Sequence, residues 1–179
     1  MPMNGRAALR RAAVASAAAG TALGLLATPA LACPEHKQGP TRVKGPTYTY
    51  HRGYSKVKEI ITVRETRNRT IVHLAVSGFP KSAAGKRFGA HVHRDKCGPK
   101  PAQSGPHYQR RAKRSTPLRF KEIWLDVRIG KDGRGRSRAV VPWRVAKGLR
   151  SVVIHAKPTN AKTGDAGARL LCTTVPFGR

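Results

Sequence analysis

Acidic residues are scarce in this sequence. Its 179 residues include 8 Asp and Glu against 36 Lys and Arg, which gives a formal net charge of +28. No acidic pair, Gly-rich phosphate-binding loop or Gly-x-Ser-x-Gly motif is present, so paired-carboxylate, nucleotide-phosphate and serine-hydrolase chemistry have no support. The positive charge favours association with anions of many kinds and says nothing about the fold.

Aromatic side chains are also few, at 6% of the residues. Proteins that hold single-stranded nucleic acid stack its bases on such side chains. Their scarcity argues against a nucleic-acid partner, and so does the export signal described next. We therefore expect the excess positive charge to bind anionic cell-wall polymers or a membrane surface.

The N-terminus has the three parts of a secretory signal peptide. Its start is positively charged, residues 12–26 are apolar and rich in Ala, and Ala30-Leu31-Ala32 matches the small-x-small cleavage pattern. We predict that residues 1–32 are a signal peptide and that the protein works outside the cell or in its envelope. An uncleaved membrane anchor is one alternative. Cleavage would leave Cys33 first in the chain, where acylation into a lipoprotein is another.

Only three cysteines, Cys33, Cys97 and Cys172, are present. Outside the cytosol, cysteines usually pair. Residues 33–46 are rich in Pro and Gly and are predicted to be a flexible linker, so Cys33 is a less favoured partner than the other two. A bridge between Cys97 and Cys172 would contribute roughly 4 kcal/mol on the loop-entropy model.

After the linker, the sequence has the pattern of short strands and shows no convincing amphipathic helix. Val72, Leu74 and Val76 share one face of residues 70–76, which leaves His73 on the exposed face. With six other β-rich runs this makes seven runs, close to the eight strands expected for the fold; the other runs are 57–64, 87–93, 122–129, 136–143, 151–156 and 170–175. The expected fold is all-β, an eight-stranded Greek-key barrel or sandwich in one domain over residues 47–177.

Two connections between these strands carry further predictions. Lys131-Asp132-Gly133 is a hairpin turn signal, which predicts that residues 122–129 pair with residues 136–143. Residues 94–119 form a long loop that is rich in basic residues. A loop of this length in a compact domain is usually functional or disordered.

The most informative stretch is Gly89-Ala90-His91-Val92-His93. On a strand, residues two apart point to the same face, so His91 and His93 would present two imidazoles to one point. Such a pair is a common start of a metal site. By itself it is also compatible with two unrelated surface histidines.

Together with further sequence blocks, this stretch makes the chain resemble the copper/zinc superoxide dismutase family, in particular secreted bacterial members. After Gly89-Ala90-His91-Val92-His93 come, in the family's order, Cys97, Gly105-Pro106-His107, the run 151–156 that ends in His155-Ala156, and the run 163–172 from Thr163-Gly164-Asp165 to Cys172. The resemblance covers about residues 47–177. It implies the family's Greek-key β-barrel fold.

Residue by residue, the resemblance assigns the chemistry. It implies one copper ion per chain with four ligands: His91, His93, His107 and His155. It implies that Arg169 lies beside the copper and orients superoxide, a small anion, and that His107 also takes part in catalysis. It implies a disulfide between Cys97 and Cys172, in agreement with the pairing argued above.

The zinc site of the family has no counterpart in this chain. Members that bind zinc supply further histidines and an aspartate after the position of His107, but no histidine lies between His107 and His155 here. Residues 122–126 stand where the family has its zinc aspartate, and Trp124 in this segment is expected to fill the core. The resemblance is therefore to a copper-only variant without zinc.

The leading hypothesis is a secreted copper-dependent superoxide dismutase that converts superoxide to dioxygen and hydrogen peroxide. Two alternatives remain open: a non-catalytic copper-binding module, and a protein that binds anionic polymers on the same fold. The groups that would orient His107 in the absence of zinc are not evident from the sequence. Neither is the oligomeric state.

Overall fold

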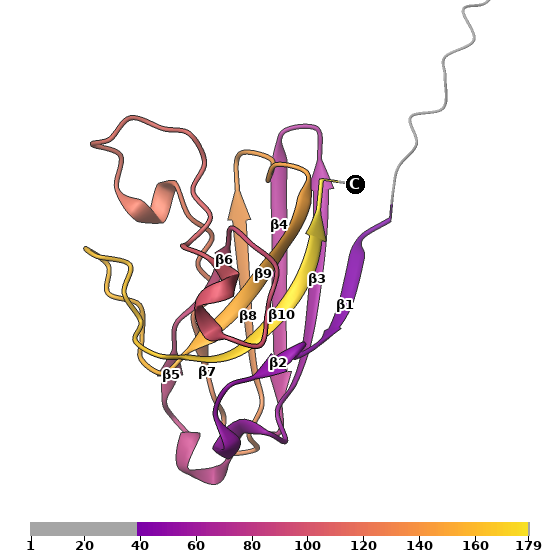
Figure 1. The fold of residues 1–179 in the computed structure, drawn as a ribbon, viewed down its shortest axis with the longest axis vertical. Coiled ribbons are helices and arrows are strands. Elements are labelled where there is room, and N and C mark those ends of the chain that lie inside the picture. Colours follow the sequence, from indigo (N-terminus) through magenta and orange to yellow (C-terminus); the bar gives the residue numbers. More distant parts are fainter. Residues whose placement is uncertain (1–38, 179) are drawn as a thin grey trace, which may run out of the picture. The chain divides into compact units, whose positions relative to one another are not determined.

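The computed structural model describes residues 39–178 of the chain (Figure 1). The predicted signal peptide, the fate of Cys33 and the first part of the predicted linker lie outside the described residues. Within 39–178, no helix is both long enough and apolar enough to cross a membrane. The regular structure there consists of short 3-10 turns and ten strands: β1 (Thr41–Gly45), β2 (Tyr48–Thr49), β3 (Lys58–Thr66), β4 (Arg69–Ser77), β5 (Arg87–Phe88), β6 (Ala90–His93), β7 (Val127–Arg128), β8 (Gly135–Val141), β9 (Gly148–His155) and β10 (Arg169–Phe177).

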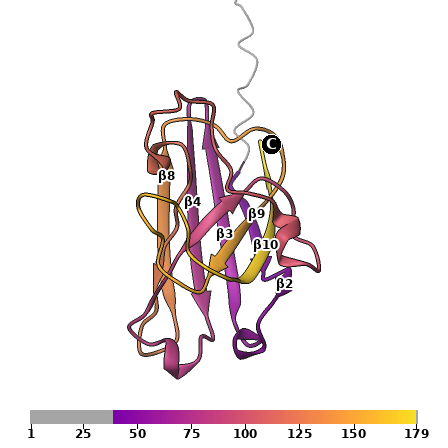
Figure 2. The ribbon, with the colours of Figure 1, turned by 60° about the vertical axis from the view of Figure 1, so that its left-hand side comes forward.

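The strands form two four-stranded antiparallel sheets and one short pair. The first sheet has the order β1-β3-β4-β8, the second has the order β2-β10-β9-β6, and β5 pairs with β7. Figure 2 shows β8, β4 and β3 side by side in one layer. The prediction of an all-β fold is confirmed. Neither of these four-stranded sheets closes into a barrel, and the arrangement of residues 39–178 is consistent with a β-sandwich.

One apolar core lies between the two sheets. In β4, Val72, Leu74 and Val76 point inward and are buried, while His73 is exposed, as their alternation predicts. Val152 and Ile154 of β9 face them from the second sheet and belong to the same core cluster. Because side chains alternate along each strand, the outer faces of both sheets remain available for other roles.

The predicted linker is too long at its C-terminal end. Residues 41–45 form β1, which pairs in antiparallel register with β3, from Thr41 opposite Val63 to Gly45 opposite Glu59. Of the residues that suggested a linker, Gly45 ends this strand and Pro46 follows it, and the peptide bond between them is cis. The folded domain therefore begins before residue 47.

The segment 122–129 also differs from its prediction. Ile123, Leu125 and Val127 are buried in alternation, as in a strand, but only Val127–Arg128 belongs to a sheet, where it pairs with β5. Residues 123–125 lie beside β6 instead, held by backbone hydrogen bonds from Val92 to Ile123 and from Leu125 to Ala90. The predicted pairing with residues 136–143 is wrong: β8 pairs with β4 and is the edge strand of the first sheet, while β7 pairs with β5. The turn at 131–133 is present, with a positive φ at Gly133.

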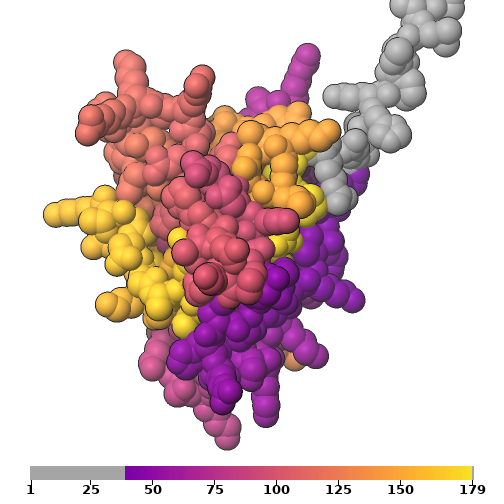
Figure 3. Space-filling view, viewed as in Figure 1, coloured from indigo at the N-terminus to yellow at the C-terminus, as the bar shows by residue number. Residues whose placement is uncertain are grey.

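Two loops cover the outer face of the second sheet. One runs from β6 to β7 over residues 94–126 and contains two 3-10 turns, Pro101–Ser104 and Leu118–Phe120. The other joins β9 to β10 over residues 156–168. A Cβ atom at Gly164 in the second loop would lie within 3.5 Å of side-chain atoms of Leu118 and His107 in the first. The two loops therefore meet over the sheet, and Figure 3 shows them side by side on the molecular surface.

Candidate metal centre

The four predicted histidine ligands come together on the outer face of the second sheet. His91 and His93 alternate along β6 with Ala90 and Val92, which belong to the core, so both imidazoles point away from the core. His155 is the last residue of β9. His107 lies in the loop opposite His93, with which it forms an isolated β-bridge. One nitrogen from each imidazole lies within 4.8 Å of those of the others, so the four could hold one metal ion.

Backbone carbonyls fix the proton of two of these imidazoles. Nδ1 of His93 lies 2.9 Å from the carbonyl oxygen of Gly105, and Nδ1 of His155 lies 2.9 Å from that of Gly167. A carbonyl only accepts, so each Nδ1 must donate, and each neutral ring then carries a bare lone pair on Nε2. These two Nε2 atoms lie 3.2 Å apart. Two lone pairs at that distance repel each other unless a cation or a proton lies between them.

In His91 one ring nitrogen also donates a hydrogen bond and the other is bare, but the roles of Nδ1 and Nε2 are exchanged. Nε2 of His91 lies 2.7 Å from Oγ1 of Thr159, which is also 2.5 Å from Oδ1 of Asp126. Because the threonine hydroxyl donates its one proton to the carboxylate, Nε2 of His91 donates to the hydroxyl. Nδ1 of His91 is therefore unprotonated, and it is buried with no hydrogen-bond partner. An orphaned buried acceptor of this kind is what a metal ion would satisfy.

Glu122 orients the fourth histidine, a role that is not evident from the sequence. Its Oε2 accepts hydrogen bonds from Nδ1 of His107 at 2.9 Å and from Nε1 of Trp124 at 2.7 Å, and its Oε1 accepts one from Gln109 at 2.7 Å. Nε2 of His107 is thus free to face the other three rings. A glutamate at the start of an apolar run, in a chain with 8 acidic residues, was the available sequence signal for this role. Trp124 is half-buried and holds Glu122, so the prediction that it fills the core is wrong.

The hydrogen bonds also set the charge of Glu122. Burial would raise the pKa of its carboxyl, but the hydrogen bonds from His107, Trp124 and Gln109 outweigh burial and leave the pKa below its usual value. Glu122 is therefore an anion at neutral pH. It contributes a fixed negative charge on the far side of His107.

Three of the imidazoles are neutral at physiological pH. Burial, reinforced by the neighbouring histidines, lowers the pKa of His91 to about 2. Burial also lowers the pKa of His93 to about 3 and that of His155 to about 4, and the positive charge of Arg169 adds to both effects. Neutral imidazoles are the form that binds a metal ion. A set of four imidazole nitrogens within 4.8 Å of one another therefore fits a transition-metal ion such as copper.

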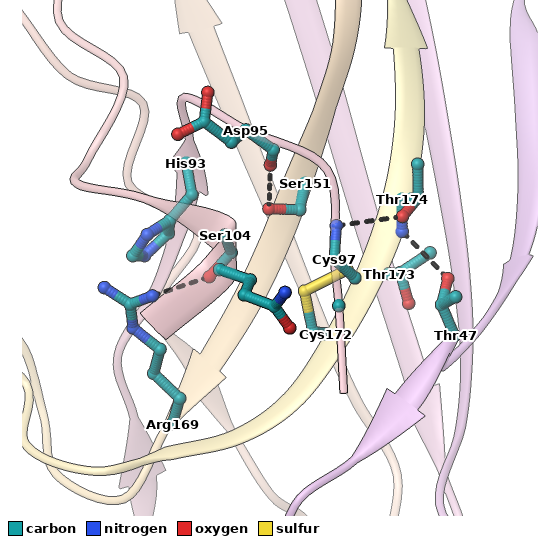
Figure 4. The surroundings of a disulfide bond; sticks show 12 residues. Thr47, His93, Asp95, Cys97, Ser104, Ser151, Arg169, Cys172, Thr173 and Thr174 are labelled. Carbon is teal, nitrogen blue, oxygen red and sulfur yellow. Dashed lines mark hydrogen bonds between the residues drawn. A yellow bond between two sulfur atoms is a disulfide. The ribbon is translucent and has the colours of Figure 1, made fainter. Parts of the chain in front are cut away.

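Arg169 lies beside the histidines and is held rigidly. It is the first residue of β10 and stands opposite His155 in the strand register. Its guanidinium donates to the carbonyl of Pro101 at 2.6 Å, to Oγ of Ser104 at 2.7 Å and to the carbonyl of Gly105 at 2.8 Å. Figure 4 shows the guanidinium next to Ser104 and on the same side as the ring of His93. This side chain is only partly buried, so it presents a fixed cation at the rim of the centre.

The disulfide anchors the loop that supports both His93 and Arg169. Cys97 and Cys172 form the predicted bridge, which joins the start of the 94–126 loop to β10 (Figure 4). The amide of Cys97 also donates to Oγ1 of Thr174 on the same strand, at 3.1 Å. A buried disulfide is typical of proteins from oxidising compartments.

No second group of this kind accompanies the histidines in the described part of the chain. Among residues 39–178, the four histidines are the one set of three or more His, Cys, Asp and Glu side chains close enough to share an ion. Asp126, which lies in the segment where the resemblance puts a zinc aspartate, instead accepts the amide and the hydroxyl of Thr159. No family model matches this chain, and no curated protein matches it.

Proposed function

We propose that this protein is a copper-dependent superoxide dismutase of the copper/zinc superoxide dismutase family, with the family's Greek-key fold and without its zinc. The observation that carries the proposal is the convergence of four imidazoles, each with one nitrogen within 4.8 Å of the others, beside the fixed cation of Arg169. Copper suits four nitrogen ligands and, when bound, would supply one-electron chemistry through its two oxidation states. The ligands would be His91, His93, His107 and His155.

Arg169 would bind and orient the substrate. Superoxide is a small anion, and a guanidinium held by three hydrogen bonds keeps its charge at one place. Two of those bonds go to Ser104 and Gly105, and the carbonyl of Gly105 also accepts from His93. A single peptide unit thus couples the position of the substrate-binding cation to that of a ligand.

His107 would move a proton at Nε2. Hydrogen peroxide forms only when the reduced oxygen receives protons, and His107 is the one ligand that is only half-buried. Glu122 keeps a proton on Nδ1 of His107 and stabilises the ring by its negative charge when Nε2 is protonated. In this proposal the carboxylate of Glu122 holds Nδ1 of His107, which zinc would hold in zinc-binding family members.

The basic loop near the centre would speed the arrival of superoxide. Residues 110–114 of the 94–126 loop include four cations: the exposed Arg111, Lys113 and Arg114, and the partly buried Arg110. A positive field raises the encounter rate of a small anion, and salt reduces the gain. The predicted signal peptide and the disulfide support an exported enzyme.

A measurement of metal content and turnover tests the proposal. The purified protein is loaded with copper, metals are counted per chain, and removal of superoxide is timed by pulse radiolysis. We expect one copper per chain and rapid removal, and a loss of both in His155→Ala. If the copper-loaded protein is no faster than His155→Ala, the enzyme proposal fails and the non-catalytic copper-binding module stands. One bound zinc per chain would contradict the copper-only assignment.

A further inference from the structure

The outer face of the first sheet is a layer of positive charge that contains no acid. Side chains along its four strands alternate between the core and this face, and the two acids of these strands, Glu59 and Glu65, both lie on the inward alternation. The outward side chains include seven exposed cations, which together define the basic sheet face: Arg42, Lys44, Lys58, Arg64, Arg69, Arg136 and Arg138.

These cations have no partners within the part of the chain that the structure describes. The two salt bridges formed among residues 39–178 lie elsewhere, between Arg94 and Asp95 and between His107 and Glu122. Seven like charges on one sheet face repel one another in the free protein. Binding of an anionic partner would relieve this repulsion and release the counterions that screen it.

The strand register arranges four of the cations in two parallel tracks. Arg42 and Lys44 lie on edge strand β1, and Arg136 and Arg138 lie on the opposite edge strand β8. Strand geometry places the two cations of each track about 7 Å apart and the tracks about 14 Å apart. One row across the sheet runs from Arg42 through Thr62 and His73 to Arg138, and the next runs from Lys44 to Arg136.

We propose that the basic sheet face binds a linear anionic polymer with one negative charge in each short repeat, such as a polyphosphodiester. Cations about 7 Å apart along a strand match successive charges along an extended flexible chain. The strip between the tracks carries only small, β-branched and histidine side chains on its central rows. A flexible chain can lie across such a surface without steric conflict.

A membrane and a nucleic acid fit this face less well. Proteins that lie on a bilayer insert large apolar side chains beside their cations. Among the described residues the exposed large apolar side chains are Phe120, Val140 and Leu149, of which only Val140 belongs to this face. Single-stranded nucleic acid needs aromatic platforms for its bases, and the outward positions of the four strands hold no Phe, Tyr or Trp.

The basic sheet face lies on the opposite side of the sandwich from the metal centre. It is the outer face of the first sheet, whereas His91, His93 and His155 lie on the outer face of the second sheet, with the shared core between them. A polymer bound there would hold the protein in place and leave the metal centre open to small molecules. This inference goes beyond the proposed function and does not depend on it, because polymer binding needs no metal.

Two charge-matched variants test the inference. The first replaces Arg42, Lys44, Arg136 and Arg138 with Gln. The control replaces four exposed cations of the 94–126 loop with Gln, again three Arg and one Lys: Arg111, Lys113, Arg114 and Arg119. Affinity for poly(glycerol phosphate) is measured by calorimetry at several salt concentrations, on metal-free protein. Vesicles of phosphatidylglycerol and phosphatidylcholine form a parallel arm, and circular dichroism checks that each variant is folded.

We expect the sheet-face variant to lose about tenfold or more in affinity for the polymer and to show a weaker salt dependence. The loop variant should bind the polymer within about twofold of the unmodified protein. Equal losses in both variants would show that net charge alone is responsible and would overturn the inference. So would failure of the unmodified protein to bind the polymer at physiological salt, or binding to vesicles without binding to the polymer.

Discussion

Oε2 of Glu122 lies 2.9 Å from Nδ1 of His107, and this contact organises the exposed side of the metal centre. The carboxylate fixes the tautomer of His107 and leaves its Nε2 directed at the other three imidazoles. Trp124 and Gln109 in turn hold the carboxylate in place. The candidate centre therefore has an anion of the protein itself on the side of the His107 ring opposite Nε2, the nitrogen that would bind a metal.

The first prediction concerns this carboxylate. Glu122→Gln keeps the shape of the side chain but removes its charge, so the Nδ1 proton of His107 has a weaker acceptor and the ring is a poorer ligand. We expect copper affinity to fall about 10- to 100-fold, measured by competition with a chelator of known affinity. Gln109→Ala, which touches Glu122 but no histidine, is the matched control and should lose much less. Equal affinity in Glu122→Gln and the unmodified protein would refute this role.

Arg169 should affect turnover rather than metal binding. Arg169→Gln removes the cation beside the centre while the four histidines remain, so the rate constant for superoxide removal should fall by about tenfold or more at low salt. Copper content should stay at the level of the unmodified protein. Arg67→Gln, an exposed cation in the turn between β3 and β4, is the control with the same charge change. A parallel loss of copper would show that Arg169 acts mainly through the loop that supports His93.

Removal of the disulfide should weaken both the fold and the centre. The bridge joins residues 75 apart in sequence, and replacing Cys97 and Cys172 with Ser should lower the free energy of unfolding by about 4 kcal/mol. Urea unfolding monitored by circular dichroism measures this. Because the released loop carries Gly105, which accepts from His93 and Arg169, copper affinity should fall as well. Thr174→Val keeps the bridge, removes the acceptor of the Cys97 amide and should cost about 1 kcal/mol.

A buried acid should make the stability of the protein depend on pH. Glu59 lies between the sheets, 1% exposed, and accepts from Thr173 while its Oε1 has no partner. Burial raises its pKa from 4.5 to about 7, although the hydrogen bond from Thr173 opposes this. Between these values the folded protein binds a proton that the unfolded chain has lost. The contribution of Glu59 to stability is thus full below pH 4.5 and declines as the pH rises to about 7.

Glu59→Gln tests this dependence, because the amide does not titrate. Between pH 5 and pH 8 the unmodified protein should lose about 3 kcal/mol more of its unfolding free energy than the variant does. Urea unfolding at each pH is the measurement. Identical pH profiles for the two proteins would contradict the assignment. Substitution of Gly45 by a larger residue should also destabilise the protein, since a Cβ there would overlap the side chain of Thr173, which donates to Glu59.

Much of the architecture could be predicted from local pattern. The alternation of Val72, Leu74 and Val76 identified an inward face and left His73 outside, because burial in a sheet has a period of two. Residues 122–129 show the limit of this reasoning. Their alternation correctly identifies which side chains are buried, but it does not identify the pairing partner, which depends on which backbone edge is available in three dimensions.

The sequence by itself determined the alternating strands, the excess of cations and the identity of the four histidines and two cysteines that come together. Only the tertiary structure decided the roles of Glu122, Thr159 and Asp126 around those histidines, because a hydrogen bond between residues far apart in sequence leaves no periodic trace. It also decided that the cations of β1 and β8 share a face without acids. Strand order, which sets that face, arises from packing over the whole domain, whereas residue pattern records only the local choice between inside and outside.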